Sequence, residues 1–221
     1  MSIVVISDTH LTEKFSQKKF DKLKSIISGS DQVVLNGDFW DGYQTDFDSF
    51  YNSKWSALFP ILKSKKTIYI FGNHDKKEFS DDRIQNFCDV ATSEFTVETS
   101  KYKFRFEHGH ERVWKVDRKL GLNRPPKWLS IGSDKAQSIL LRSFGLKAYC
   151  WMFGKMNATL KKSIKKSGLN DPGTFHFFGH VHIAELDLKS NFVNTGVFNH
   201  GHAQYAVVEA DGKIKAFKEK Y

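Results

Sequence analysis

Five short clusters contain the side chains of this chain that could do chemistry. They are Asp8 and His10 in "SDTH", Asp38 and Asp41 in "GDFWD", Asn73, His74 and Asp75 in "GNHD", His108 in "EHGH", and His180 and His182 in "GHVH". Carboxylate, amide and imidazole groups without a thiolate are ligands for divalent ions such as Mn²⁺, Fe²⁺, Zn²⁺ or Mg²⁺. The clusters therefore predict a metal site.

Each cluster alone has a plainer interpretation. Gly and Asn tolerate tight turns and Asp is favoured at helix N-caps, so Asp8 or Asp38 alone would indicate a cap. His108 alone would be interpreted as a surface or hydrogen-bonded histidine. The joint occurrence of all five clusters favours the metal site.

The spacing within the clusters suits two ions. In Asp8-x-His10 and His180-x-His182 the side chains are two positions apart, and extended backbone would direct both to one side. Asp38 has two carboxylate oxygens and can bridge two ions. Two ions about 3.5 to 4 Å apart bind both an attacking water and a phosphoryl oxygen, and they neutralise developing charge. Phosphoester hydrolysis is the predicted reaction.

The clusters follow segments with the pattern of β-strands. Apolar and β-branched runs in "IVVIS", "QVVLNGD" and "TIYIFGNHD" each end in polar residues, and apolar residues at helical spacing lie between Phe15 and Ile27. A second helix is expected over 45–63. Residues 95–107 alternate like a hairpin, and 174–219 indicate short strands with antiparallel pairing. We expect an α/β fold of two packed mixed β-sheets flanked by helices, with the chemistry at strand ends.

The five clusters, in this order, resemble the calcineurin-like metallophosphoesterase superfamily, and the resemblance extends from Asp8 to "VNTG" at 193–196. It implies a four-layer sandwich and two divalent metal ions, with Mn²⁺ the expected ion. One ion would be held by Asp8, His10, Asp38 and His182, and the other by Asp38, Asn73, His108 and His180.

The same resemblance gives roles to the neighbouring residues. His74 would face the substrate phosphate and assist the leaving group, with Asp75 as the residue that orients it. Asp41 is expected to orient ligands without binding an ion. His110 is the alternative to His108 as a ligand.

A basic segment interrupts the predicted single domain, 1–221. The whole chain has a formal charge of +9, whereas 111–170 alone has 14 Lys and Arg but 3 Asp and Glu, so the rest of the chain is slightly acidic. This aromatic insertion is expected to form helices at about 133–143 and 147–167 after "RPPKW", which would stop a helix. Its position between the fourth and fifth clusters predicts a cap over the site. Its candidate substrate-binding residues are Arg112, Trp114, Arg118, Trp128 and Arg142.

The insertion has three possible uses: a solvated basic face, a clamp for a nucleotide or nucleic acid, and a cap for an acylated substrate at a membrane surface. Its position resembles that in UDP-2,3-diacylglucosamine pyrophosphatases, although many members of that branch have arginine where this chain has His74. The expected partner is a phosphorylated small molecule or nucleotide-lipid, with nucleic acid as the alternative. A non-catalytic scaffold on this fold would have lost ligands, whereas all five clusters are present.

The cysteines, the start of the chain and its apolar regions indicate the cellular compartment. Cys88 and Cys150 are far apart and indicate neither a disulfide framework nor a zinc site. The start of the chain has no basic leader, and the apolar region at 138–155 is interrupted by charges. We expect a cytoplasmic protein, with peripheral membrane contact as an option. His200 and His202 fit no motif and are expected to be ordinary surface histidines.

Overall fold

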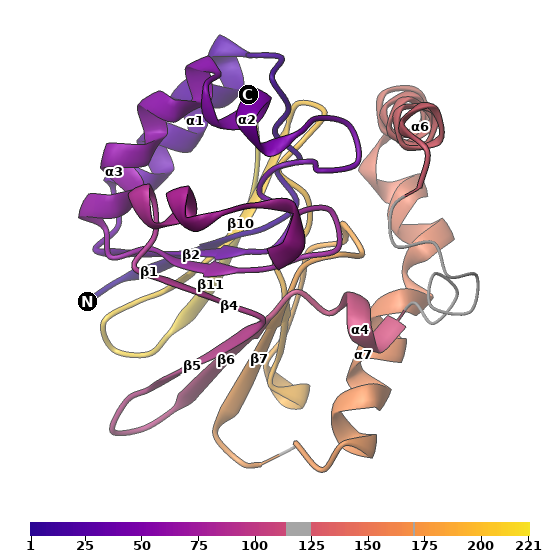
Figure 1. The fold of residues 1–221 in the computed structure, drawn as a ribbon. Helices are drawn as coiled ribbons and strands as arrows, with labels where there is room; N and C mark the ends of the chain where they lie inside the picture. Colours follow the sequence, from indigo (N-terminus) through magenta and orange to yellow (C-terminus); the bar gives the residue numbers. More distant parts are fainter. Residues whose placement is uncertain (114–124, 170) are drawn as a thin grey trace.

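Two β-sheets pack face to face in the computed structural model, which describes residues 1–113, 125–169 and 171–221, with helices on the outer sides (Figure 1). The first sheet has the strand order β11-β10-β1-β2-β3-β4. Its strands are β1 Ile3–Ile6, β2 Gln32–Asn36, β3 Ile68–Ile70, β4 Val90–Thr92, β10 His202–Val208 and β11 Ile214–Lys220. Strands β1 to β4 are parallel, so their carboxyl ends meet at one edge.

The second sheet has the order β5-β6-β7-β9-β8. Its strands are β5 Glu94–Glu98, β6 Lys103–Glu107, β7 Thr174–Phe178, β8 Glu185–Asp187 and β9 Phe192–Asn194. The β5–β6 hairpin confirms the alternating pattern of 95–107. The antiparallel pairing expected over 174–219 is wrong for β7, which pairs in parallel with both β6 and β9. The expected fold of two mixed sheets flanked by helices is confirmed.

Helices cover the outer face of the first sheet. α1, Gln17–Ser28, begins after Ser16, whose side chain accepts a hydrogen bond from the amide of Lys19, and it buries Leu23 and Ile27. The single helix expected over 45–63 is wrong, because three short helices form there: α2 Phe47–Tyr51, η1 Lys54–Leu58 and α3 Phe59–Ser64. The chain turns at Asn52 and Ser53, between α2 and η1. Pro60 lies in the first turn of α3, where proline is tolerated. Single 3₁₀ turns form at η2 Lys77–Phe79, η3 Asp82–Asn86 and η4 Leu188–Ser190.

The insertion is helical where it is described. It contains α4 His110–Val113, α6 Lys127–Phe153 and α7 Lys155–Lys166. α6 starts directly after Pro126 and breaks at Gly145, whose φ of 74° and ψ of 173° are not helical. This break separates the two predicted helices, although the first begins six residues earlier than expected. Within the described residues no helix is both long and apolar enough to span a bilayer.

Three apolar clusters hold these layers together. One lies between the first sheet and its helices, a second between the two sheets, and a third beneath the insertion. In the third, Leu160 and Ile164 of α7 pack near Phe178 and Phe192 of the second sheet. Each large side chain buried in this way contributes roughly 1.5 to 3 kcal/mol. The insertion is therefore fixed to the sheet that carries two of the five clusters (Figure 1).

Candidate metal centre

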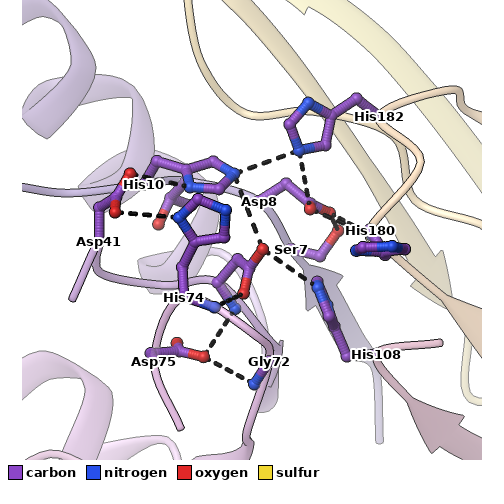
Figure 2. Close-up of polar contacts among 12 residues, drawn as sticks. Ser7, Asp8, His10, Asp41, Gly72, His74, Asp75, His108, His180 and His182 are labelled. Atoms are coloured by element: carbon purple, nitrogen blue, oxygen red, sulfur yellow. Dashed lines mark hydrogen bonds and ion pairs between the residues drawn. The ribbon is translucent and has the colours of Figure 1, made fainter. Parts of the chain in front are cut away.

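The five sequence clusters converge at the carboxyl ends of five strands. Asp8, Asp38, Asn73, His108 and His180 follow β1, β2, β3, β6 and β7, and Figure 2 shows the rings of the histidines arranged around Asp8. Because β1 to β3 are parallel neighbours in one sheet and β6 and β7 in the other, the two packed sheets deliver these loops to one place. Parallel-strand ends are where α/β folds place their sites.

Several of these residues have a backbone conformation that is uncommon for residues other than glycine. φ is positive at Asp8 (54°), His10 (44°), Asp38 (54°), His180 (66°) and His182 (58°). The extended backbone expected for Asp8-x-His10 and His180-x-His182 is therefore wrong. Left-handed backbone costs on the order of 1 kcal/mol or more per residue and is concentrated at functional sites.

The first group of donors contains Asp8, His10 and His182, whose ligand atoms lie within 4.8 Å of one another. His182 Nε2 is 3.1 Å from Asp8 Oδ1 and 3.1 Å from His10 Nε2. The second group contains Asp38, His108 and His180. Asp38 Oδ2 is 3.1 Å from His108 Nε2 and 3.9 Å from His10 Nε2, so this oxygen lies between the two groups.

Unpaired buried atoms show that the donors fit metal ions. Asn73 Oδ1, His108 Nε2 and His180 Nε2 are buried and accept or donate no hydrogen bond within the described residues. An unsatisfied buried polar atom costs about 1 to 3 kcal/mol. The contact of His108 Nε2 with Asp38 lacks hydrogen-bond geometry, so both atoms remain available to an ion. His108 Nδ1 donates to the carbonyl of Asn36 at 2.9 Å, which leaves Nε2 as the ligand nitrogen.

Burial and neighbouring charges shift the pKa values of the residues in the second group. Burial alone would lower the pKa of His108, but the Asp38 carboxylate raises that pKa to about 10. Burial would raise the pKa of Asp38, yet His108 and His74 hold it well below its usual range. Burial and the neighbouring His108 lower the pKa of His180 well below its usual value. Asp38 is therefore an anion and His180 a neutral imidazole, the forms that bind metal ions.

Asp41 takes the place predicted for Asp75. Asp41 Oδ1 is 2.9 Å from His74 Nδ1 and its Oδ2 is 3.4 Å from His10 Nδ1, as expected for a residue that orients others. His74 is partly buried, which would lower its pKa, but Asp41 and Asp38 raise that pKa to about 9. The prediction that Asp75 orients His74 is wrong (Figure 2).

Asp75 instead supports the backbone beneath the site. It is fully buried and accepts hydrogen bonds from the amides of Asp38, Phe39 and Gly72 at 3.0, 2.7 and 2.6 Å, and from the hydroxyl of Tyr69 at 2.6 Å. The carboxylate therefore ties the β2 loop to the β3 loop. Its burial excludes contact with a substrate.

Glycine allows two of these loops to approach. A Cβ at Gly72 would overlap Asp38 Oδ1, and a Cβ at Gly37 would overlap the ring of His108. Gly37 also has a φ of +86°, which a side chain would strain. His110, the alternative ligand, lies farther out, with its ring centroid 5.5 Å from that of His108.

A model of the calcineurin-like phosphoesterase family matches residues 1–184. The chain belongs to this family. A search of curated proteins gives no significant match. Among solved structures, a novel archaeal phosphodiesterase is 16% identical, with 99% of each chain covered and a TM-score of 0.51. A Thermotoga maritima protein is 18% identical, with 100% and 99% covered and a TM-score of 0.50. The phosphoesterase YfcE of E. coli is 14% identical, with 98% of each chain covered and a TM-score of 0.47.

The protein is thus a metal-dependent phosphoesterase, and its cavity lies between the metal centre and the insertion. This cavity of about 470 Å³ is lined by His10, Asp38, Asn73, His74, His180 and His182 on the metal side. Leu129, Gln137, Tyr149 and Met156 line it on the insertion side. Residues of the insertion therefore form one wall of this cavity.

Two of the substrate-binding residues predicted within the insertion do not line this cavity. Arg112 Nε binds Glu107 Oε2 at 2.7 Å, and Arg112 is not part of the cavity wall. Trp128 is 73% exposed and faces solvent. Both predictions are wrong for this cavity. Trp114, Arg118 and the side chain of Arg142 lie outside the described residues, as does the side chain of Cys150, whereas Cys88 is buried in the core.

Two insertion residues at the phosphoesterase site were not predicted. Gln137 hydrogen-bonds His182 Nδ1, and Asp134 Oδ1 lies 3.1 Å from His200 Nε2. The expectation of an ordinary surface histidine is wrong for His200, whose side chain is 8% exposed and whose φ is 51°. No sequence motif marks these contacts, because they depend on how α6 docks.

Proposed function

We propose that this phosphoesterase hydrolyses a phosphodiester or diphosphate bond in a substrate with an apolar portion, of the UDP-2,3-diacylglucosamine type. The observation that carries the proposal is the composition of the cavity. Metal-ligating side chains form one wall, and Leu129, Tyr149, Met156 and Val181 line it with apolar surface. A phosphoryl group would lie against the first wall and an apolar group against the second.

The residues of the metal centre would bind two ions. The first ion would be held by Asp8, His10, Asp38 and His182, and the second by Asp38, Asn73, His108 and His180. Two divalent ions, with Mn²⁺ the expected choice, would activate water and neutralise charge on the phosphoryl group.

His74 would act on the leaving group. Its Nδ1 is held by Asp41, so Nε2 is left for the substrate in the cavity. The carboxylates that raise the pKa of His74 keep a proton on the imidazole at neutral pH. That proton can be given to the oxygen that leaves phosphorus. Tyr43, with its ring centroid 4.3 Å from that of His74, packs beside the imidazole and restricts its position.

The outer surface of α6 supports a membrane-associated setting. Its large apolar side chains Trp128, Leu129, Ile139 and Phe144 are between 47% and 73% exposed. Lys127 and Lys135 lie on the same helix. Apolar and basic side chains on one helix suit the surface of an anionic bilayer. We place the protein in the cytoplasm, with this helix in peripheral contact with lipid.

Three substrates compared side by side test the proposal. Mn²⁺-loaded protein is incubated with a chromogenic phosphodiester, a short single-stranded oligonucleotide and an acylated UDP-sugar diphosphate. Selective turnover of the acylated diphosphate is expected. Cleavage of the oligonucleotide without activity on the lipid would replace the proposal with a nuclease, and no turnover of any substrate by metal-loaded protein would support a non-catalytic scaffold.

A further inference from the structure

A second cavity lies beside the metal centre, across His10 from the first. Its volume is about 260 Å³, and it shares His10, Gln44 and Asp134 with the substrate cavity. The two cavities are therefore neighbours that share these three side chains in their walls. His10 is the predicted metal ligand in the wall of the second cavity, and the other predicted ligands are not part of that wall. The second cavity is therefore lined by a different set of side chains.

A buried lysine that has no ion pair among the described residues lies in its wall. Lys19 is 6% exposed, and its ammonium group donates to the carbonyl of Thr9 and to Asn199 Oδ1, the latter at 3.0 Å. Within the described residues no carboxylate lies within ion-pair distance of Lys19 Nζ. Burying a cation without an anion is costly. Burial lowers the pKa of Lys19 to about 7, which reflects this cost.

Two uncharged features of the wall also favour a negatively charged ligand. Trp55 lines the cavity and is 1% exposed, and its indole N–H has no acceptor within the described residues. Ser16, the N-cap of the twelve-residue helix α1, is also in the wall, and the first turn of α1 has no acidic residue. A helix N-terminus carries about half a positive charge and attracts anions.

Two more lysines complete the wall. Lys14 and Lys135 are exposed at the cavity, and neither ammonium group has an ion pair among the described residues. Asp134 is the acidic residue of the wall, and its carboxylate is paired with His200. Three lysines thus line this cavity, and Asp134, the acidic residue of its wall among the described residues, already pairs with His200.

We propose that this second cavity binds a phosphate-like oxyanion, so that the substrate carries a second phosphate besides the phosphoester that is hydrolysed. This inference rests on the proposed function, because it assigns a further part of the same substrate. The reacting phosphoryl group lies on one side of His10 and the second phosphate on the other. Ser16 at the N-terminus of α1, Lys14 and Lys135 line this cavity and would contact the second phosphate.

Matched nucleotides test the second site. Substrates are thymidine 5′-(4-nitrophenyl phosphate) and the same compound with a 3′-phosphate, assayed with Mn²⁺-loaded wild type, a Lys14→Ala/Lys135→Ala variant and Lys19→Met. For wild type, the 3′-phosphate is expected to lower KM about tenfold, the size of one good charge-assisted contact. Both variants should lose this advantage and keep the wild-type KM for the compound without it.

Lys218→Ala is the control, since Lys218 is an exposed lysine of β11 that lines neither cavity. An equal KM for the two substrates in wild type would overturn the inference. Loss of the advantage in Lys218→Ala as well would overturn it too, because the effect would then come from the general positive charge of the protein.

Calorimetry keeps this inference separate from the proposed function. Thymidine 3′,5′-bisphosphate and thymidine 5′-monophosphate are titrated into the same metal-loaded proteins, so binding is measured without turnover. A tighter bisphosphate complex that depends on Lys14 and Lys135 supports the second site even where no substrate is hydrolysed. Equal affinities for the two nucleotides would refute it whether or not the protein is an active phosphoesterase.

Discussion

Gln137 of α6 hydrogen-bonds Nδ1 of His182, a predicted ligand of the first ion, and also donates to the hydroxyl of Tyr149 at 3.1 Å. Gln137 Nε2 thus contacts the ring nitrogen of His182 other than Nε2, the nitrogen that lies 3.1 Å from Asp8 Oδ1. Such a contact fixes the orientation of a metal-bound histidine and tunes its basicity. The insertion therefore contacts a predicted metal ligand as well as lining the cavity.

Gln137→Leu is expected to weaken binding of the first ion about 10- to 100-fold, the usual effect of losing the hydrogen-bond partner of a ligating histidine. Competition of the protein with a chelator of known affinity measures this constant directly. Ser143→Ala, at an exposed position of the same helix, is the control and should bind metal like wild type. Unchanged metal affinity in Gln137→Leu would mean that the residue contacts His182 without positioning it.

Asp38→Ala should weaken metal binding at both positions, because Asp38 Oδ2 lies between the two donor groups. Elemental analysis after dialysis is expected to fall from two ions per chain to one or none. Asp82→Ala is the control, since Asp82 is an exposed carboxylate that belongs to none of the candidate ligand groups. Equal metal content in wild type and Asp38→Ala would contradict the bridging role.

His74→Ala should keep both ions but lower kcat by about 10²- to 10⁴-fold, the range for loss of a general acid. The loss should shrink for a 4-nitrophenyl ester, because a good leaving group needs little help from a proton donor. Comparing kcat for 4-nitrophenyl and alkyl phosphodiesters therefore separates acid catalysis from other roles. The same loss for both leaving groups would assign His74 to stabilising the phosphoryl group instead.

The sequence was sufficient to predict the fold and the convergence of the five clusters. Strand patterns before Asp8, Asp38 and Asn73 place those residues at neighbouring strand ends of a parallel sheet, whatever the details of the loops. The loop geometry itself was not predictable, because the positive φ of Asp8 and His10 depends on contacts such as the hydrogen bond from His10 N to Asp38 O.

Contacts between distant segments account for the remaining errors. Asp75 follows His74 directly in the sequence and Asp41 lies 33 residues before it, yet Asp41 contacts the imidazole whereas Asp75 accepts from backbone amides such as that of Gly72. Arg112 was predicted to bind substrate as a basic residue of the insertion, but its guanidinium group forms an ion pair with Glu107 instead. Side-chain partners of this kind depend on tertiary packing, which composition and periodicity do not encode.

Asp75→Ala should destabilise the protein by about 4 kcal/mol, because it leaves three buried amides and the Tyr69 hydroxyl without their acceptor. Urea unfolding followed by tryptophan fluorescence measures the change. Asp75→Asn keeps one acceptor oxygen and should lose less. If Asp75→Ala unfolded like wild type but had lost activity, Asp75 would have the catalytic role that its place after His74 suggested.

Lys19 should make the stability of the ligand-free protein depend on pH. Burial lowers its pKa to about 7 in the folded protein, from 10.5 in the unfolded chain. Between these values the unfolded chain binds the extra proton, so the free energy of unfolding rises with pH, by at most about 1.4 kcal/mol per pH unit. Below pH 7 both states are protonated and the slope due to Lys19 disappears.

The difference between wild type and Lys19→Met isolates this effect from other titrating groups. Urea unfolding at pH 7 and pH 9.5 should show wild type gaining stability relative to Lys19→Met as the pH rises, whereas Lys18→Met, at the exposed neighbouring position, should follow wild type. Saturating thymidine 3′,5′-bisphosphate should flatten the wild-type slope, because a bound anion stabilises the charged lysine. A pH-independent difference between wild type and Lys19→Met would show that the buried ammonium group carries no such penalty.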